Sequence, residues 1–444
     1  MGAAIGTMEY KEEFVNQLVN KWVEQIETLS KIAAFEPHTA YTSFTSCLRH
    51  RYTYYMRTIP NIAHLLDPLE NAIRNKLLPA LLEGRFVNEE ERKLLSLPPR
   101  LGGMGIIIPN EVSENEFSMS KLATQLLSDA IINQEKKLPD GFEAKSREAK
   151  QSIRKVRREK QMCKLENIRR QMTAEEKRAN EISQEKGVSN WLTALPIEEK
   201  GFHLCKREFW DAINVRYGWP LTRLPSKCAC GSIFTIEHAL SCKKGGFVIQ
   251  RHNEVRDLTA NLLNVVCSDV AIEPQLEELT GETLTSGRSA NRSSEARLDI
   301  SARGVWCRHQ RAFFDVRIFN PNAPRYLNQK LSKTYVTHEK EKKRKYVERV
   351  LDVEGGTFTP LVFSVFGGMG QECQMFYKRL CLLLAEKRGE DIGIITSWVR
   401  TTISFALLRS VLVAIRGSRH PFYKRTMSEV EMKLDMEETN IRDF

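Results

Sequence analysis

The segment A-F-F-D-V-R-I-F, residues 312–319, decides the fold predicted for this chain, together with A-R-L-D-I-S-A at residues 296–302. Both segments are short, apolar and rich in strand-forming side chains, so each predicts a β-strand. Each also carries one aspartate, Asp315 in the first segment and Asp299 in the second. A charged side chain in a strand built for burial costs free energy unless it is paired or bound to a metal. The two aspartates are therefore the first candidate functional residues.

The elements predicted on either side of this pair define one mixed α+β or α/β domain over residues 251–425. A helix and a strand are predicted before the pair, and a helix, a strongly apolar strand and two further helices after it. The order is α-β-β-β-α-β followed by α-α, which predicts a sheet covered by helices. A charged tail, residues 426–444, is predicted to be flexible. The predicted ranges are 251–266 (helix), 270–276 (strand), 280–294 (polar loop), 332–353 (helix), 358–366 (strand), 370–387 (helix) and 396–416 (helix).

A cysteine/histidine segment precedes this domain. In C-A-C-G-S-I-F-T-I-E-H-A-L-S-C, residues 228–242, Cys228 and Cys230 sit on a tight turn before a glycine. His238 and Cys242 are four residues apart, so a helix would present them on one face. Three thiolates and one imidazole are a set that Zn²⁺ binds tetrahedrally. The segment therefore predicts a zinc knuckle with these four ligands; the alternative is a pair of buried thiols beside a helix-face histidine.

The residues before this segment predict a helical N-terminal half. Residues 1–135 carry apolar side chains at helical spacing, interrupted by L-P-P-R-L-G-G-M-G-I at residues 97–106. That stretch lacks the lysine–hydroxyl pair of a P-loop, which favours a structural turn. Residues 136–190 are mostly charged, with only a narrow stripe of apolar side chains, and this pattern predicts an exposed helical linker. The linker either contacts phosphates or is simply solvated. Residues 191–250 predict an aromatic helical lead-in that ends in the zinc knuckle.

The composition of the chain points to a polyanionic partner. Among 444 residues, 67 Lys and Arg outnumber 56 Asp and Glu, which gives a formal net charge of +11. This balance favours nucleic acid, although a merely soluble basic protein has it too. Of the ten cysteines, the seven outside the knuckle are scattered along the chain, which predicts intracellular thiols. We expect a nuclear or cytoplasmic protein, neither secreted nor membrane-bound, because Arg400 interrupts the longest apolar run and the first residues lack a secretory signal.

The chemistry that the two aspartates suggest is phosphodiester cleavage. Carboxylates at the ends of adjacent strands can hold Mg²⁺, which activates a water, and a nearby cation can stabilise the transition state. Arg317 follows Asp315 by two residues, so both side chains share one face of the strand. The alternative is structural, with Asp299 in an ion pair with Arg297 or Arg317.

The helix predicted at residues 332–353 supplies further cations. It carries one stripe of polar side chains at positions i, i+4, i+7 and i+8. A lysine of this stripe could reach the carboxylates; equally, the stripe could be a basic face that contacts DNA. Weaker candidates for a third carboxylate are Glu254 and Glu273. The stripe consists of His338, Lys342, Lys345 and Tyr346.

Together these motifs resemble the C-terminal region of non-LTR retrotransposon proteins that carry a restriction-like endonuclease. The resemblance covers residues 200–425 and rests on C-A-C-G, E-H-A-L-S-C-K-K-G-G-F, R-H-N-E-V, R-L-D-I, F-F-D-V-R and the lysine/tyrosine helix. It implies a zinc knuckle, a helix with an R-H motif and a nuclease of the PD-(D/E)xK fold. Residues 1–135 are similar to the segment that follows a reverse transcriptase palm, in G-A-A-I-G-T, R-Y-T-Y-Y-M-R-T-I-P and L-P-P-R-L-G-G-M-G-I.

The catalytic residues of this family carry over onto part of the chain. Asp299 matches the aspartate of the PD element, with Leu298 in place of proline, and Asp315 matches the second acid. Arg317 stands where the simplest pattern has lysine. In retroelement endonucleases the lysine can come from the later helix. The resemblance therefore adds Lys342 and Lys345, with Tyr346 beside them.

The chain contains no Tyr/Phe-x-Asp-Asp motif, so the polymerase palm is missing and no polymerase activity is expected. The resemblance implies a Mg²⁺-dependent endonuclease that nicks target DNA, with a zinc knuckle and a thumb-like N-terminal remnant. Two alternatives stay open: a catalytically inactive relic that binds nucleic acid, and a host protein that uses the fold to bind DNA or RNA. The expected partners are DNA and the RNA of the element.

Overall fold

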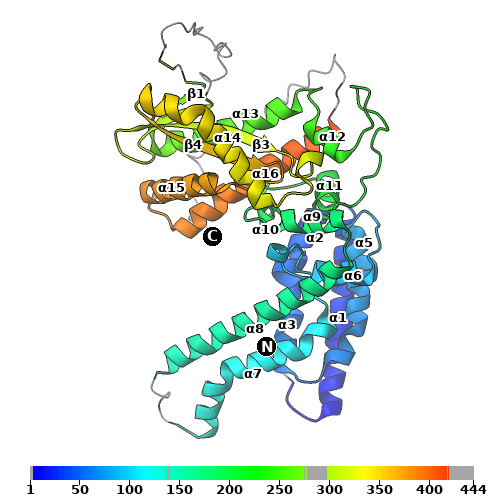
Figure 1. Cartoon of the computed structure of the whole chain (residues 1–444). Coiled ribbons are helices and arrows are strands. Elements are labelled where there is room, and N and C mark those ends of the chain that lie inside the picture. The colour runs from blue at the N-terminus through cyan, green and yellow to red at the C-terminus, as the bar shows by residue number, and fades with distance from the viewer. Residues whose placement is uncertain are drawn as a thin grey trace. The chain divides into compact units, whose positions relative to one another are not determined.

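The computed structural model describes residues 4–135, 137, 141–274, 276–277, 298–417 and 419 (Figure 1). The chain divides into two compact units. The polar loop predicted at 280–294 and the tail predicted at 426–444 lie outside the described residues. The N-terminal unit contains Met1–Gln184, Leu192–Ile197 and His203–Pro220, and the C-terminal unit contains Glu185–Trp191, Glu198–Phe202 and Leu221–Phe444.

The N-terminal unit is helical throughout its described residues, as the sequence predicts. Its first helix, α1 (Met8–Ala33), begins where Thr7 accepts the backbone N–H of Tyr10. α1 buries one stripe of apolar side chains that includes Trp22 and Ile26. The further helices are α2 (Pro37–Ser43), η1 (Phe44–Leu48), α3 (Arg49–Thr58), η2 (Ala63–Leu66), α4 (Asp67–Ala72), η3 (Ile73–Leu77), α5 (Leu78–Leu81), α6 (Glu89–Ser96), η4 (Pro99–Leu101), α7 (Pro109–Ile132), α8 (Phe142–Gln171), α9 (Ala174–Ser183), α11 (Lys206–Tyr217) and, where the chain passes between the units, α10 (Asn190–Thr193).

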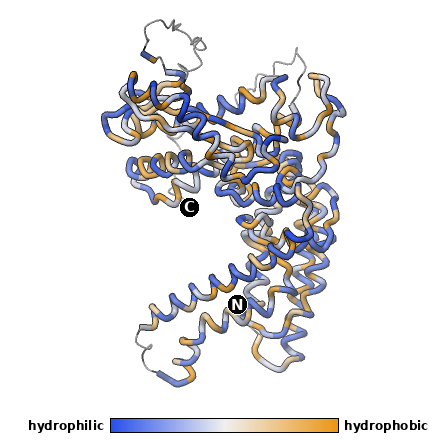
Figure 2. Tube along the Cα trace, viewed as in Figure 1, coloured by the Kyte–Doolittle hydropathy of each residue, from blue (hydrophilic) through white to orange (hydrophobic). Residues whose placement is uncertain are grey.

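Most of the charged segment predicted as a separate linker belongs to this N-terminal unit. Figure 2 shows hydrophilic residues along most of α8, yet the helix packs beside α7. Ion pairs join the two helices, Arg157 with Glu116 at 2.8 Å and Lys164 with Glu111 at 2.8 Å. The predicted helical linker is not one continuous helix: α8 ends at Gln171, and Thr173 starts α9 with a capping box. These charged side chains therefore hold α8 in place instead of leaving it free.

The glycine-rich stretch at 97–106 forms a packed turn. A Cβ on Gly103 would lie 1.9 Å from the carbonyl oxygen of Leu97, so only glycine fits at this position. Arg92 is fully buried, and its Nη1 donates to the carbonyl oxygen of Ile106 at 2.7 Å. The turn is thus closed by backbone contact and a buried guanidinium, which matches the structural turn expected from the sequence.

The C-terminal unit contains a small mixed sheet with helices around it (Figure 1). Its four described strands lie in the order β1-β2-β3-β4; β2 is antiparallel to β1 and β3, and β4 is parallel to β3. Along the chain, the elements from α13 to α16 follow in the order that the sequence predicts. Their bounds are α12 (Ile236–Ser241), α13 (Phe247–Val266), β1 (Ser268–Ile272), β2 (Ile300–Arg303), β3 (Arg311–Phe319), η5 (Pro324–Tyr326), α14 (Leu331–Asp352), β4 (Thr357–Ser364), α15 (Gln371–Arg388) and α16 (Ile392–Arg416).

The sheet separates two apolar clusters in this unit. Ala312 and Phe314 of β3 belong to the larger cluster, together with side chains of α13, α15 and α16. Phe313 points to the opposite face, where it packs with Tyr346 and Val350 of α14. Helices therefore cover both faces, and the mixed α+β architecture predicted from the sequence is confirmed.

One helix among the described residues, α16, is long and apolar enough to span a membrane by length and composition. Most of its apolar window is buried inside the C-terminal unit. Its side chains Ile403 and Leu407, for example, belong to the larger apolar cluster. A helix that is apolar on all sides and packed in this way is typical of a protein core.

Candidate acidic and metal-binding sites

Asp299 and Asp315 meet where β2 begins beside the middle of β3. Ile300 pairs with Phe314, so one further step along this antiparallel register brings Asp299 opposite Asp315. The backbone N–H of Asp299 donates to the carbonyl oxygen of Phe314 at 3.1 Å, which keeps the two strands together at this point. The tertiary pairing therefore places the two predicted acids at one site.

The carboxylate of Asp299 is held by two donors. Its Oδ2 accepts the backbone N–H of Val316 at 2.7 Å and lies 3.2 Å from Nε2 of His252 on α13. The sequence predicts Asp299 inside a strand, but it immediately precedes β2. Here the side chain of Asp299 binds the N–H of Val316, and the regular pairing of β2 with β3 starts at Ile300.

Asp315 is paired with a lysine from the helix on the opposite side. Nζ of Lys342, on α14, lies 2.6 Å from Oδ2 of Asp315. Asp315 is 4% exposed, and the side chain of Lys342 is mostly buried. The two helices that flank the pair thus supply one cationic or titratable group each, His252 from α13 and Lys342 from α14.

The two carboxylates differ in their affinity for a proton. Burial and the negative charge of Asp299 raise the pKa of Asp315, and the ammonium of Lys342 offsets only part of this rise. Burial alone would raise the pKa of Asp299, but the hydrogen bond and charge of His252, together with the N–H of Val316 and the charge of Lys342, outweigh it and lower this pKa. Burial opposes the charge on His252, yet the contact with Asp299 prevails and raises its pKa. The pair therefore combines an ionised Asp299 with an Asp315 that takes up a proton more readily.

The predicted residues of the α14 stripe occupy different surroundings. Lys342 contacts Asp315, as described above. Tyr346 is buried in the apolar cluster with Phe313, where its ring has a packing role. Lys345 is exposed, and its Nζ lies 4.8 Å from the centre of the Tyr346 ring. Of the two lysines proposed from the sequence, Lys342 is the one that forms the ion pair with the acid.

Arg317 lies two residues after Asp315 on β3, and its positive charge affects the protonation of His338, the first residue of the α14 stripe. Burial and, after it, the charge of Arg317 lower the pKa of His338. His338 is buried, and its Nε2 lies 3.0 Å from the hydroxyl oxygen of Tyr326. The alternative pair between Asp299 and Arg297 cannot be placed, because Arg297 lies outside the described residues.

His252 and Arg256 are site residues to which the sequence analysis assigned no role. Nη1 of Arg256 lies 2.7 Å from Oε1 of Glu273, whose backbone N–H donates to the carbonyl oxygen of Asp299 at 2.8 Å. The other candidate for a third carboxylate, Glu254, accepts a hydrogen bond from a serine of α16. His252 and Arg256 are four residues apart, and this spacing in R-H-N-E-V-R would have indicated one polar helix face.

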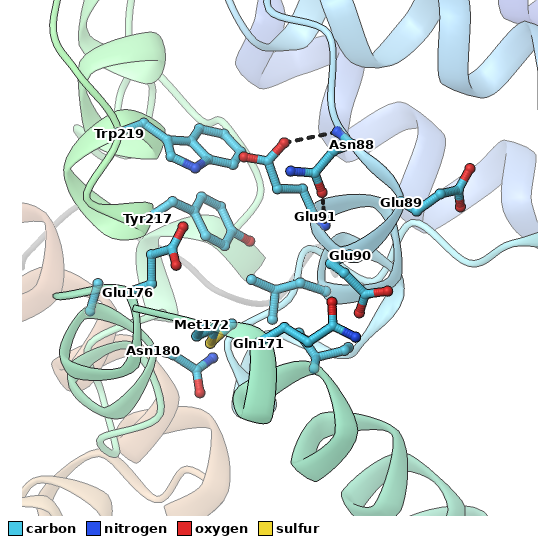
Figure 3. Close-up of a pocket in the computed structure, with 13 residues that line it drawn as sticks. Asn88, Glu89, Glu90, Glu91, Gln171, Met172, Glu176, Asn180, Tyr217 and Trp219 are labelled. Atoms are coloured by element: carbon cyan, nitrogen blue, oxygen red, sulfur yellow. Dashed lines mark hydrogen bonds between the residues drawn. The ribbon is translucent and has the colours of Figure 1, made fainter. Parts of the chain in front are cut away.

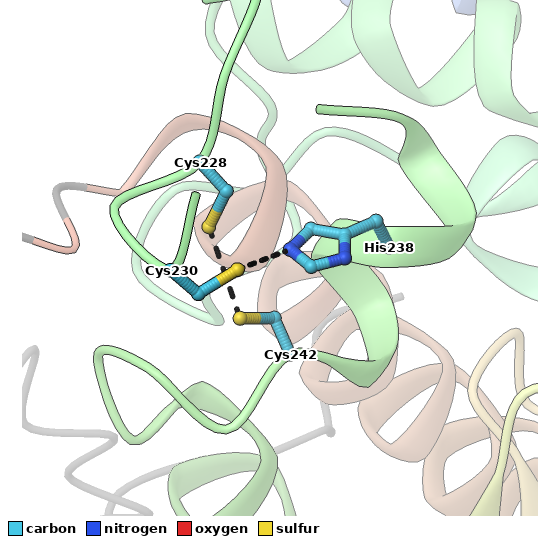
Figure 4. Close-up of side chains that lie close together, drawn as sticks. All are labelled: Cys228, Cys230, His238 and Cys242. Atoms are coloured by element: carbon cyan, nitrogen blue, oxygen red, sulfur yellow. Dashed lines mark hydrogen bonds between the residues drawn. The ribbon is translucent and has the colours of Figure 1, made fainter. Parts of the chain in front are cut away.

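The four predicted zinc ligands converge in the C-terminal unit and form a Cys₃His cluster (Figure 4). Their ligand atoms all lie within 4.8 Å of one another. Sγ of Cys228 is 3.8 Å from Sγ of Cys242, and Sγ of Cys230 is 3.3 Å from Nε2 of His238. A tetrahedral zinc ion with Zn–S bonds of about 2.3 Å would separate two sulfurs by roughly 3.8 Å. The cluster therefore has the composition and spacing of a site for a metal such as zinc.

Local sequence features shape this cluster. Gly231, with φ of +91°, closes the turn after the first two cysteines. Thr235 starts α12 and accepts the backbone N–H of His238 at 3.1 Å, which sets the orientation of the short helix. Hydrogen bonds from Ser232 lower the pKa of Cys230 to about 6, which favours the thiolate that binds metals.

Two arginines attach the Cys₃His cluster to the rest of the unit. Nη2 of Arg251, on α13, donates to the carbonyl oxygen of Leu240 at 3.0 Å. Nη2 of Arg419 donates to the carbonyl oxygen of Ala239 at 3.1 Å. Both arginines are buried, and both bind carbonyls at the C-terminal end of α12, which lack partners within the helix. The cluster is thus packed into the unit that carries the acidic pair.

A separate cavity of about 340 Å³ lies in the N-terminal unit, lined by an aromatic pair that includes Trp219 and by glutamates of α6 (Figure 3). The carboxylates on its rim already have partners. Glu91 pairs with Arg85, and Glu90 pairs with Lys93 at 2.9 Å. Their negative charge is therefore largely compensated within the protein.

Comparison with known protein families and with curated proteins finds no match for this chain. Its function must therefore be inferred from the acidic pair and the Cys₃His cluster themselves.

Proposed function

We propose that this chain is a metal-dependent DNA endonuclease with a zinc-binding knuckle beside its nuclease domain. The observation that carries the proposal is the convergence of Asp299, Asp315 and Lys342 at one point of the sheet. Two carboxylates and one lysine are the groups that metal-assisted phosphodiester cleavage needs. The formal net charge of +11 favours a polyanionic substrate.

The order and pairing of the elements support a nuclease of the PD-(D/E)xK type. The run α13-β1-β2-β3-α14-β4, with β4 parallel to β3, corresponds to the αβββαβ arrangement that the family resemblance implies. In this assignment Asp299 is the first acid and Asp315 is the second. Arg317 stands where the family pattern has its catalytic lysine, and Lys342 would take over the role of that lysine.

The donor set fits a hard cation such as Mg²⁺, because two carboxylates that meet across paired strands, close enough for the charge of Asp299 to raise the pKa of Asp315, offer oxygen ligands at one point. Asp299 and Asp315 would hold the ion, which when bound supplies a Lewis acid and an activated water. His252 keeps Asp299 ionised and oriented. Lys342 places a positive charge where negative charge grows on the phosphate during cleavage.

The Cys₃His cluster is proposed to hold one structural zinc ion. Four protein ligands leave no open position on a tetrahedral metal, which is the arrangement of a structural site. Zinc would fix the loop before α12 against α13 and so stabilise the surface next to the nuclease domain. Lys243 and Lys244, which follow Cys242 and are exposed, would contact a phosphate backbone.

The proposal extends to the origin of the protein. We propose that it corresponds to the C-terminal region of a non-LTR retrotransposon protein. It would act in the nucleus, where it nicks target DNA, and the RNA of the element would be its second partner.

Plasmid nicking by the purified chain with Mg²⁺ or Mn²⁺ tests the proposal. Wild type should nick, and Asp299→Asn or Asp315→Asn should slow nicking by about 100-fold or more. DNA binding by these variants should be unchanged or slightly stronger, because a negative charge near phosphate is removed. Asp269→Asn, an exposed aspartate on β1, is the matched control and should nick like wild type.

The second candidate function is binding of DNA or RNA without cleavage, by a relic of the element or by a host protein. The observation that favours it is Arg317, which occupies the position of the usual catalytic lysine. A wild-type chain that binds nucleic acid but never nicks with either metal would establish this second function and reject the first.

A further inference from the structure

A cavity of about 300 Å³ lies beside the Cys₃His cluster, inside the C-terminal unit. Its walls come from two distant parts of the chain, the loop that carries Cys228 and the end of α16 with the residues after it. None of the described residues that line it is acidic. Four of them are cationic: Arg223, Lys227, Arg416 and Arg419.

Arg419 forms the buried wall of this cavity. It is 8% exposed, and its guanidinium lies 5.2 Å from the ring centre of Phe234 and 4.9 Å from that of Phe247. Its Nη2 donates to the carbonyl oxygen of Ala239, but its Nε has no hydrogen-bond partner among the described residues. A buried guanidinium with an unused N–H is costly, and an anion in the cavity would compensate the positive charge.

The other three cations surround the mouth of the cavity. Nη1 of Arg416 donates to the carbonyl oxygens of Thr222 and Arg223, at 2.9 and 3.1 Å, which holds this guanidinium at the rim. The side chains of Arg223 and Lys227 belong to exposed residues, so an incoming anion can reach them from solvent. Two anchored guanidinium groups and two exposed cations thus form one concave, positively charged site.

We propose that this cavity binds one phosphate group of a nucleic acid. A phosphate is compact, carries negative charge and accepts several N–H donors at once, which matches a small cavity lined by arginine and lysine. The inference rests on the nucleic-acid partner of the proposed function, and it adds a specific anchoring site apart from the acidic pair. The phosphate could be a 5′-terminal monoester or an internal diester, and both share the chemistry that the cavity recognises.

The test measures binding of the full zinc-loaded chain to a short single-stranded oligonucleotide, with or without a 5′-phosphate, by fluorescence anisotropy without added Mg²⁺. Arg223→Glu and Lys227→Glu should each weaken binding about tenfold or more, because each replaces a phosphate contact with a repulsive charge. The control is Lys378→Glu on α15, an exposed residue outside the cavity with the same change of charge. If the Arg223 and Lys227 variants lose affinity only for the 5′-phosphorylated strand, the cavity binds a terminal phosphate. If they lose affinity equally for both strands, it binds an internal diester.

Equal weakening by Arg223→Glu, Lys227→Glu and Lys378→Glu would overturn the proposal, because it would show that only the overall charge matters. Arg223→Gln and Lys227→Gln, checked by circular dichroism and zinc content, keep the test valid if a glutamate variant misfolds. They should also weaken binding more than Lys378→Gln does. Because no cleavage is measured, a chain that never nicks can still pass this test, so the two proposals fail separately.

Discussion

Arg251 and His252 are consecutive residues near the start of α13, and their side chains reach two different sites. Nη2 of Arg251 donates to the carbonyl oxygen of Leu240, at the Cys₃His cluster, over 3.0 Å. Nε2 of His252 lies 3.2 Å from Oδ2 of Asp299 in the acidic pair. One turn of helix therefore connects both sites, so a displacement of α13 would change both contacts together.

Substitutions of Arg251 and His252 should have different effects on zinc retention and on nicking. Arg251→Ala should weaken zinc retention about tenfold and also slow nicking, because it frees the end of α12 and loosens α13. His252→Asn should slow nicking about tenfold and leave the zinc content unchanged, because the His252 ring contacts Asp299 and the carbonyl oxygen of Val316 on β3 and none of the four cluster residues. Zinc competition with a chelator and plasmid nicking measure the two effects. Loss of zinc from His252→Asn, or wild-type nicking by Arg251→Ala, would contradict the connection.

Lys342→Ala should both destabilise the C-terminal unit and slow nicking. The substitution leaves the buried carboxylate of Asp315 without its partner, which should cost roughly 3 kcal/mol of unfolding free energy near neutral pH. Urea denaturation followed by tryptophan fluorescence measures this loss. Lys343→Ala is the matched control, because Lys343 pairs with Glu372 near the surface and should cost less than about 1 kcal/mol. Equal effects of the two substitutions would show that the Lys342 pair has no special role.

The purified chain should contain about one zinc ion per molecule. Cys230→Ser and Cys242→Ser together should remove it, since two of the four ligands are lost. Cys163→Ser on α8, an exposed cysteine outside the cluster, should keep it. Metal analysis of the three proteins decides the assignment, and zinc that survives in the double variant would place the ion elsewhere.

DNA binding should weaken steeply as salt is raised. The chain has a net charge of +11, and the lysine and arginine side chains of α14 would neutralise several phosphates. Each neutralised phosphate releases a bound counterion, so the affinity for DNA falls as the salt concentration rises. Anisotropy titrations from about 50 mM to about 200 mM salt should show a loss of affinity of at least roughly 100-fold. A nearly flat salt response would mean that binding does not depend on phosphate contacts.

The N-terminal unit should lose stability below neutral pH because of His38. Burial, with a smaller contribution from the charge of His203, lowers the pKa of His38 to about 4, and its Nδ1 accepts the backbone N–H of Leu204 at 3.1 Å. The unfolded chain takes up this proton near pH 6.5, before the folded unit does. Stability is therefore complete above about pH 6.5 and falls by roughly 3 kcal/mol as the pH drops toward 4.

Denaturation of His38→Asn over this pH range checks that prediction. Asparagine keeps an acceptor for Leu204 but does not titrate, so the variant should lose less stability on acidification than wild type. His64→Asn, at an exposed histidine, should behave like wild type. An unchanged pH dependence in His38→Asn would assign the acid sensitivity to other groups.

The order of the elements and the four residues of the Cys₃His cluster could be predicted from local sequence patterns. Strands such as 312–319 and helices such as 332–353 are defined by local apolar periodicity, and the structure reproduces both as β3 and α14 within a residue or two. The four residues of the Cys₃His cluster lie on one short segment, so a turn and one helical turn suffice to bring them together. Local patterns are informative wherever the interacting residues are close in the chain.

The residues that surround the acidic pair could not be predicted in this way, because they come together through tertiary packing. Asp299 and Asp315 meet through strand register, and Lys342 and His252 reach them from helices on either side of the sheet. Spacing along the helix could not distinguish Lys342 from Lys345, because both lie on the same stripe and only packing against β3 sets which one contacts the acid. The charged α8 likewise becomes part of the N-terminal unit through ion pairs with α7, whose partners are about forty to fifty residues away in the chain. Contacts at such separations depend on how whole elements pack, which no local pattern records.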